Sequence, residues 1–215
     1  DATAPRPEGH FRERTADQVA DRALGFLEGA GRRGPFFLWA HFFDPHAEYS
    51  PPAEYRRAGT PYDGEIAFVD AQLGRILAAL EESGRLDDTI VVVTADHGEG
   101  LGDHGEATHG YFLYDSTLRV PLVVRWASGL EPGTSVADPV RLVDVCPTIL
   151  DLAGVEGPPD QDGLSLSSAA KGGAVDARVA HAEAWERLGQ FGWRPLVSVR
   201  ARGWKFIDGG DADRE

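Results

Sequence analysis

The chain has 215 residues, a formal net charge of −14 and no methionine. Its length suits a single domain with a core of ordinary size. The negative charge argues against a nucleic-acid partner, because nucleic-acid phosphates would be repelled. A single cysteine excludes a disulfide within the chain and a zinc site built from several cysteines. No apolar run reaches the roughly 18 residues that a membrane-spanning helix needs. Because even an initiator methionine is absent, we expect a processed product or a piece of a longer protein.

The first third of the chain predicts an irregular start, a helix and a strand. Residues 1–14 mix prolines with charges and predict an irregular lead-in. A helix is expected from Thr15, which can form a capping box with Gln18, to the glycines at positions 31 and 34. The apolar run Pro35–Phe43 then predicts a buried strand, within which His41 is expected to be a core histidine.

A second helix and two further strands are expected next. Asp63–Ser83 carries an apolar stripe at helical spacing and is followed by Gly84. The β-branched run that starts at Thr89 predicts a strand buried on both faces. Strand, helix and strand in this order predict a right-handed parallel crossover. Val120–Trp126 is the next expected strand. The stripe consists of Ile66, Val69, Leu73, Ile76, Leu77 and Leu80.

The remainder predicts a short helix, a long connection and a small sheet. We expect a helix at Val143–Leu152, with Cys146 as a core residue. Residues 155–176 are rich in Gly, Pro, Asp and Ser and predict a long connection, and residues 178–207 predict short antiparallel strands. The predicted fold is thus α/β, a mostly parallel sheet flanked by helices with a small antiparallel C-terminal sub-sheet, in one domain over residues 1–215. The expected C-terminal strands are Arg178–Trp185, Leu196–Ala201 and Trp204–Ile207.

Polar side chains gather directly after the Thr89 strand. Asp96 and His97 follow it, and glycines at positions 98, 100, 102 and 105 allow the backbone to turn tightly. Ligands of open α/β sheets bind at the carboxyl ends of the strands, where these two residues would lie. A carboxylate beside an imidazole suits a hard or borderline divalent cation. The alternative is an acidic, solvated surface loop.

Two further histidines are candidates for proton transfer. His46 follows the Pro35–Phe43 run in a proline-rich loop, and the parallel crossover would bring that loop to the same sheet edge as Asp96. His46 would then act as a general acid or as a donor to an anionic oxygen. His109 would lie at the rim of the same site. For both, the alternative is a histidine that only hydrogen-bonds within its own loop.

Several separated motifs, taken together, resemble the sulfatases of the alkaline phosphatase superfamily. The segment T-A-D-H-G-E-G-L-G-D-H-G-E is similar to the metal-binding segment of that family, and F-F-D-P-H is similar to the segment whose histidine contacts the leaving-group side of the ester. L-R-V-P-L-V-V, V-D-V-C-P-T-I-L-D-L-A-G, D-G-L-S-L and V-R-A-R-G-W-K-F-I match later segments in the same order. The resemblance implies an alkaline phosphatase-like fold, Asp96 and His97 as metal ligands, and His46 and His109 as catalytic residues. It also implies one divalent cation, calcium first, with manganese, zinc or magnesium as alternatives.

The chain also departs from the family pattern. It has no C-x-P-x-R-type motif for a formylglycine nucleophile, and the lysine that sulfatases place before the R-V-P strand is absent, with His109 near its position. We therefore expect the C-terminal part of a sulfatase-like catalytic domain, with half of the active site and no activity by itself. The missing N-terminal part of the same protein is its expected partner, and a small-molecule or glycan sulfate ester its expected substrate. The alternatives are a phosphodiesterase or phosphonate monoester hydrolase of the same superfamily, or a non-catalytic metal-binding fragment.

Overall fold

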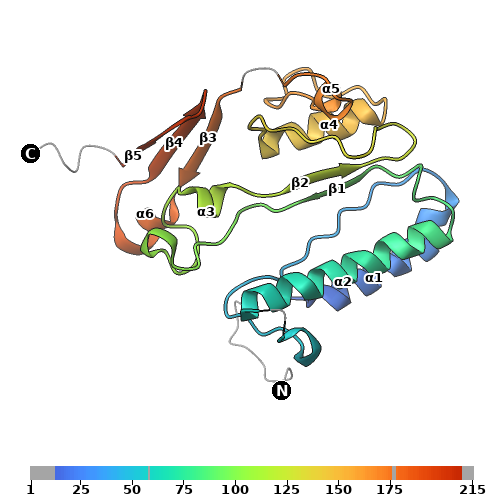
Figure 1. Cartoon of the computed structure of the whole chain (residues 1–215), viewed down its shortest axis with the longest axis horizontal. Helices are drawn as coiled ribbons and strands as arrows, with labels where there is room; N and C mark the ends of the chain where they lie inside the picture. Colours follow the sequence, from blue (N-terminus) through green and yellow to red (C-terminus); the bar gives the residue numbers. More distant parts are fainter. Residues whose placement is uncertain (1–12, 58, 176–177, 210–215) are drawn as a thin grey trace, which may run out of the picture. The chain divides into compact units, whose positions relative to one another are not determined.

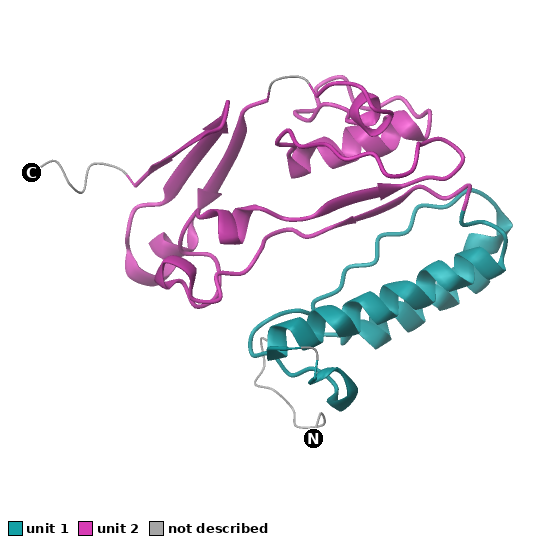
Figure 2. Ribbon diagram, viewed as in Figure 1, with its two compact units in different colours: residues 1–86 teal, residues 87–215 magenta. Residues whose placement is uncertain are grey.

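The computed structural model describes residues 13–57, 59–175 and 178–209. The chain divides into two compact units, residues 1–86 and residues 87–215, which are coloured separately in Figure 2. Each unit is described by itself. The expected lead-in at residues 1–14 lies almost entirely outside the described residues.

The first unit is built on two packed helices, α1 (Ala16–Glu28) and α2 (Pro61–Glu82), which lie side by side in Figure 1. Short 3₁₀ turns follow α1 at Ala30–Arg33 and precede α2 at Ala53–Tyr55. Small residues on α1 allow close approach to α2, and aliphatic side chains fill the interface. The buried cluster consists of Ala20, Ala23, Leu27, Ile76 and Leu80.

The predicted N-terminal cap of α1 and the predicted apolar stripe of α2 are partly wrong. Thr15 is the N-cap of α1, but its side chain makes no capping hydrogen bond, and the carboxylate of Asp44 instead accepts from the Ala16 N–H at 2.6 Å. For α2 the capping box is formed by Thr60 and Asp63. Ile66 of the expected stripe is 43% exposed. The buried face of α2 is turned slightly, and it includes Glu65, Phe68 and Gln72 as well as Ile76 and Leu80.

The expected strand Pro35–Phe43 is not a strand in the structure. Its side chains alternate as in an extended chain: Phe36, Leu38 and Phe42 pack on the helical cluster, whereas Phe37 and Trp39 are 73% and 78% exposed. A strand also needs a hydrogen-bonded neighbour, and none pairs with this segment among the described residues. His41 belongs to the exposed set, so its interpretation as a core histidine was wrong.

The second unit holds two small antiparallel sheets, connected by loops and short helices (Figure 1). β1 (Val91–Thr94) pairs with β2 (Leu122–Arg125), with Val91 opposite Arg125. β1 has three half-buried residues and one exposed residue, so it is less buried than expected. The expected parallel crossover needs a strand at Pro35–Phe43, and the described residues form none there. The other elements are a 3₁₀ turn at Asp103–Gly105, α3 (Asp115–Leu118), a 3₁₀ turn at Leu142–Asp144, α4 (Val145–Leu152), α5 (Ser167–Ala170), β3 (Ala180–Ala184), α6 (Glu186–Phe191), β4 (Leu196–Ala201) and β5 (Trp204–Asp208).

The C-terminal sheet has the order β3-β4-β5, and both of its strand pairs are antiparallel. Leu113, Ala184 and Leu196 form its buried cluster. The helix α4 begins next to Asp144 as predicted, but Cys146 is exposed rather than a core residue. The buried face of α4 is formed by Pro147, Thr148 and Leu152, and a residue two positions before Thr148 lies on the opposite side of a 3.6-residue turn.

Candidate active site

The loop after β1 folds back tightly on later residues because two of its glycines have no room for a side chain. A Cβ on Gly98 would lie 2.2 Å from the carbonyl oxygen of Ser116, and one on Gly100 would lie 2.4 Å from that of Glu106. The Gly98 N–H donates to the Thr117 carbonyl at 2.8 Å, and the Gly100 N–H donates to the Thr108 carbonyl at 2.7 Å. This close backbone approach brings residues around position 97 next to residues around position 109.

Asp96 and His97 lie together at the start of this loop and are open to solvent. Their side chains are 73% and 43% exposed, and Nε2 of His97 lies 3.8 Å from Oδ2 of Asp96. Nδ1 of His97 lies 2.9 Å from the Gly98 carbonyl oxygen, which can only accept a hydrogen bond. This contact places the proton on Nδ1 and the lone pair on Nε2, the arrangement of a metal-binding imidazole.

His109 lies against this pair with a buried carboxylate behind it. The rings of His97 and His109 have centroids 4.2 Å apart and planes tilted by 32°. Nδ1 of His109 lies 3.3 Å from a carboxylate oxygen of Glu99, whose side chain is only 5% exposed. A carboxylate that accepts from Nδ1 orients an imidazole and leaves Nε2 facing away from it. The structure thus brings together three of the four predicted site residues, and adds Glu99.

A second buried carboxylate, Glu106, holds the backbone after His109. One of its oxygens accepts from the N–H groups of Tyr111 and Phe112 at 2.9 and 3.1 Å. The other, Oε2, is buried and has no hydrogen-bond partner among the described residues. Glu106 and Glu99 look like ordinary loop acids in the sequence, and only their burial identifies them as supports of the site.

The other Asp-His pair of the loop, Asp103 and His104, is arranged differently. Nδ1 of His104 lies 3.0 Å from Asp103 Oδ1, and its ring stacks on Tyr114 with centroids 3.9 Å apart. The ring face is therefore covered by an aromatic side chain and not by a second imidazole. The sequence pattern is the same as that of Asp96 and His97, but the ring of His104 has a different neighbour.

His46 belongs to the unit of residues 1–86, and its loop is organised by Glu65. The carboxylate of Glu65 accepts from the backbone N–H groups of His46 and Ser50. The His46 ring stacks on Phe43 with centroids 4.3 Å apart, and its Nδ1 lies 2.7 Å from the Ala47 carbonyl oxygen. Burial raises the pKa of Glu65 despite these hydrogen bonds. The convergence of His46 with Asp96 stays a prediction.

The residues present fit part of a metal-binding site. Asp96 supplies a carboxylate and His97 an imidazole nitrogen, and both are accessible. No group of three or more His, Cys, Asp or Glu side chains suited to a metal ion occurs within residues 13–57, 59–175 and 178–209. A third His, Cys, Asp or Glu ligand for a cation at Asp96 and His97 would therefore come from outside these residues.

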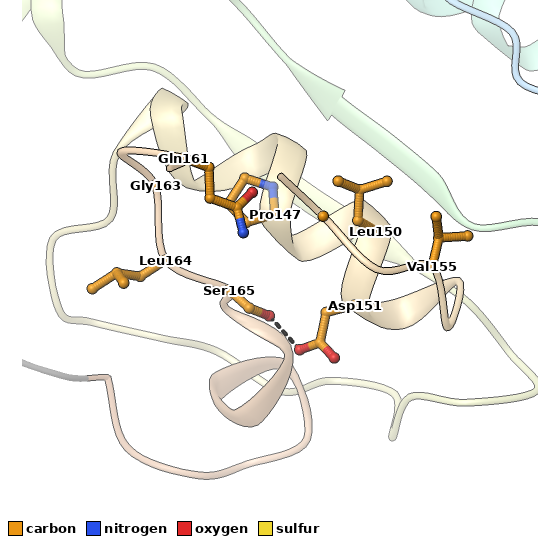
Figure 3. A pocket seen from close by; sticks show the side chains of 9 residues that line it. Pro147, Leu150, Asp151, Val155, Gln161, Gly163, Leu164 and Ser165 are labelled. Atoms are coloured by element: carbon orange, nitrogen blue, oxygen red, sulfur yellow. Dashed lines mark hydrogen bonds between the residues drawn. The ribbon is translucent and has the colours of Figure 1, made fainter. Parts of the chain in front are cut away.

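A pocket of about 280 Å³ lies elsewhere, between α4 and the connection that follows it (Figure 3). Asp151 points toward Ser165, whose hydroxyl donates to it at 2.6 Å, and it also accepts from Ser167. These hydrogen bonds lower the pKa of Asp151, so its carboxylate is ionised and already paired. None of the four candidate residues lines this pocket.

No helix among the described residues is long and apolar enough to cross a membrane.

Comparison with known sequences gives matches over most of the chain. The sequence model of the Sulfatase family matches residues 3–155. The steryl-sulfatase of Mus musculus is 37% identical over 173 residues, which cover 73% of this chain and 28% of that protein. An N-acetylglucosamine-6-O-sulfatase of Bacteroides thetaiotaomicron is 39% identical over 113 residues, covering 53% of this chain and 20% of that protein. The chain thus spans less than a third of the length of either relative.

Solved structures match nearly the whole chain. The structure of BT4656 in complex with its substrate D-glucosamine-2-N,6-O-disulfate matches with a TM-score of 0.81 and 22% identity, covering 95% of this chain and 62% of that chain. The phosphonate monoester hydrolase SpPMH from Silicibacter pomeroyi matches with a TM-score of 0.77 and 25% identity, covering 96% and 56%. These matches confirm the alkaline phosphatase-like fold, of which the described antiparallel sheets and helices form a part. Because the Sulfatase model matches well over half of the residues, the chain belongs to the sulfatase family.

Proposed function

We propose that this chain supplies metal-binding and proton-donating residues to the active site of a sulfate ester hydrolase. The observation that carries the proposal is the cluster of Asp96, His97 and His109 in one glycine-rich loop, with Glu99 buried behind it. The similarity to sulfatases supports the reaction type. The relatives are far longer than this chain, which supports a complete site that also draws residues from the rest of the protein.

In the proposed mechanism each residue has a specific role in ester hydrolysis. A divalent cation, calcium first and manganese, zinc or magnesium as alternatives, would neutralise negative charge on the ester oxygens. Asp96 and His97 would hold it through a carboxylate oxygen and Nε2. A departing alkoxide needs a proton, which His46 or His109 would donate. Glu99 would keep the His109 ring in one orientation.

The proposed substrate class is a sulfate ester of a small molecule or a glycan. Relatives include a steryl-sulfatase, an N-acetylglucosamine-6-O-sulfatase and a choline-sulfatase of Rhizobium meliloti, so the family accepts both kinds of alcohol. A phosphonate monoester hydrolase is the second candidate, supported by the structural match to SpPMH. A preference of the complete protein for phenyl phosphonates over aryl sulfates would favour this second candidate.

Metal binding by the 215-residue chain is the direct test. We expect calorimetry with calcium or manganese to show weak binding that is lost in the double variant Asp96→Ala, His97→Ala. The matched control is Asp103→Ala, His104→Ala, which removes the same two residue types from the same loop and should bind like the wild type. Equal titration curves for the wild type and the Asp96, His97 variant would contradict the assignment. We expect no turnover of aryl sulfates or aryl phosphates by this chain alone.

A further inference from the structure

We propose that three aromatic residues of the second unit, Tyr111, Phe191 and Trp193, form a platform that binds the sugar ring of a sulfated glycan beside the candidate active site. This inference rests on the proposed function for the identity of the sulfated ligand. The three residues are called the aromatic platform below. They come from two elements that are far apart in sequence, the loop after His109 and the end of α6.

The platform is a run of neighbouring rings, of which Phe191 and Trp193 are exposed and Tyr111 is half-buried. The Tyr111 and Phe191 centroids are 5.8 Å apart, and the Phe191 and Trp193 centroids are 4.8 Å apart with planes tilted by 32°. Phe191 is 53% exposed and Trp193 is 50% exposed. Exposed large apolar side chains that cluster in this way mark a binding surface more often than a random part of the surface does.

The rings are held in place although two of them are exposed. The Arg187 guanidinium lies 4.9 Å from the Trp193 ring centroid and 5.4 Å from that of Phe112, so it bridges two aromatic faces. The Tyr111 hydroxyl donates to Gln190 Oε1 at 2.7 Å. Gly192 has a φ of 67° and ends α6, and the following Trp193 N–H bonds the Arg187 carbonyl. A surface fixed before the ligand arrives loses less entropy on binding.

The aromatic platform adjoins the segment that carries His109. A Cβ built on Gly110 would lie 3.8 Å from the side chain of Glu186, so α6 packs against the residue that follows His109. Figure 1 shows α6 beside the loop between β1 and α3. The backbone N–H of Tyr111 is fixed by buried Glu106. A group that rests on Tyr111 is thus held next to the candidate proton donor.

The chemistry around the rings favours a sugar. The C–H face of a pyranose ring packs on an aromatic face, while its hydroxyl groups point outward and need polar partners. Glu186 and Gln190 stand at the edge of the aromatic platform, with Gln190 Nε2 donating to Glu186 Oε1 at 2.6 Å. Both side chains have the acceptor oxygens that hydroxyl groups bind. Gln190 Oε1 already accepts from Tyr111 and Glu186 Oε1 from Gln190, and an oxygen with two lone pairs can accept a further hydrogen bond from a sugar hydroxyl. An unsubstituted aryl ring would use the aromatic faces but make no hydrogen bond to these side chains.

The test is nuclear magnetic resonance of the five tryptophan indole N–H groups in the 215-residue chain. Each signal is assigned by a single Trp→Phe substitution, and the probes are D-glucosamine 6-sulfate, D-glucosamine, 4-nitrophenyl sulfate and inorganic sulfate. We expect the Trp193 signal to shift with both sugars. The signals of Trp39 and Trp204, which are 78% and 81% exposed, should not move and serve as internal controls.

Variants complete the test. Phe191→Ala should weaken the response of Trp193 to the sugars about tenfold, because one stacking face is lost, whereas Trp204→Phe should leave it unchanged. Absence of a Trp193 shift, equal shifts at Trp39 or Trp204, or a stronger response to 4-nitrophenyl sulfate than to the sugars would each overturn the proposal. A Trp193 response to D-glucosamine together with unchanged metal binding in the Asp96, His97 variant would leave the aromatic platform standing and reject the proposed function.

Discussion

Two carboxylates of the second unit, Asp144 and Asp96, illustrate how acids with opposite surroundings differ in role. Asp144 is fully buried, whereas the Asp96 side chain is 73% exposed. Both precede a helix or loop that resembles a sulfatase segment, so the sequence alone does not distinguish their roles. Their partners separate them: Asp144 is surrounded by donors, and the oxygens of Asp96 face its neighbour His97 and solvent.

The partners of Asp144 tie three segments together. The Arg141 guanidinium donates to it at 2.7 Å, Arg178 lies 2.9 Å away with a side chain only 4% exposed, and the Leu164 N–H donates at 2.9 Å. A Cβ on Gly163 would lie 2.0 Å from the Val143 carbonyl oxygen, so this close approach requires glycine. Asp144 is therefore a structural acid that fixes the connection after α4. Asp96 has the open surroundings of a ligand.

The largest expected effect comes from removing Asp144. Asp144→Ala should destabilise the second unit by about 3–5 kcal/mol, because the buried Arg178 charge is left without its partner. Urea unfolding followed at the Trp126 indole signal measures this loss. The control is Asp115→Ala, which also removes a carboxylate between two cations, Arg200 and Lys205, but at a site 53% exposed. We expect about 1 kcal/mol or less there. Equal losses at the two sites would remove the distinction between structural and exposed acids.

A smaller effect is expected at Glu65 in the first unit. Glu65→Ala leaves the N–H groups of His46 and Ser50 without their acceptor, at a cost of about 1–3 kcal/mol for each of these hydrogen bonds to a carboxylate. Hydrogen exchange at these two amides should therefore accelerate. Glu81→Ala on the exposed face of the same helix is the matched control and should leave both exchange rates unchanged. Unchanged rates in the Glu65 variant would show that the carboxylate does not hold the His46 loop.

The pH dependence should have opposite signs for the two buried acids. Burial acts to raise the pKa of Asp144, but hydrogen bonds from Arg141 and Leu164 outweigh it and hold the pKa below its usual value of 3.8. Its stabilising contribution is thus present above pH 3.8 and is lost as the pH falls through the lower folded-state pKa. Burial raises the pKa of Glu65 above 4.5, so its contribution is present below pH 4.5 and is lost as the pH rises through the folded-state pKa.

Stability curves of the wild type against Asp144→Asn and Glu65→Gln test these signs. The advantage of the wild type over Asp144→Asn should shrink in acid, and its advantage over Glu65→Gln should grow as the pH falls toward 4.5. Parallel curves for the two comparisons would contradict the assigned environments.

The sequence predicted helices and buried faces better than it predicted which strands pair. Apolar periodicity placed α1, α2, α4 and the strand Leu196–Ala201 correctly, because burial of one face leaves a local signal. It did not predict that β1 and β2 pair antiparallel, or that Pro35–Phe43 stays unpaired within the described residues, because pairing depends on distant neighbours. Cys146 was predicted to be a core residue but is exposed, because it lies two positions before the buried Thr148 and therefore on the opposite side of α4.

The same limit applies to the candidate site. Adjacent motifs made Asp96, His97 and His109 candidates, since residue type and glycine spacing are visible in the sequence, and the structure places the three close together. Their roles stay predictions. Glu99 and Glu106 support the site through burial and through contacts that arise when the loop folds back, and no spacing rule indicates this. The Asp103–His104 pair shows the converse, because an identical dipeptide pattern has a different environment.

The smallest expected effect on stability is at Asp96, and it tests most directly whether Asp96 differs from Asp144. In metal-free buffer Asp96→Ala should unfold within about 0.5 kcal/mol of the wild type, because an exposed side chain outside a packed network contributes little. A cation that binds only the folded state adds stability in proportion to the logarithm of its concentration over the dissociation constant, about 2.7 kcal/mol at a hundredfold excess. Saturating calcium or manganese should therefore stabilise the wild type and leave Asp96→Ala unchanged. Asp103→Ala should respond like the wild type, since its loop position differs while its charge change is the same. If Asp96→Ala is strongly destabilised without metal, Asp96 is a structural acid like Asp144 and its assignment as a ligand fails.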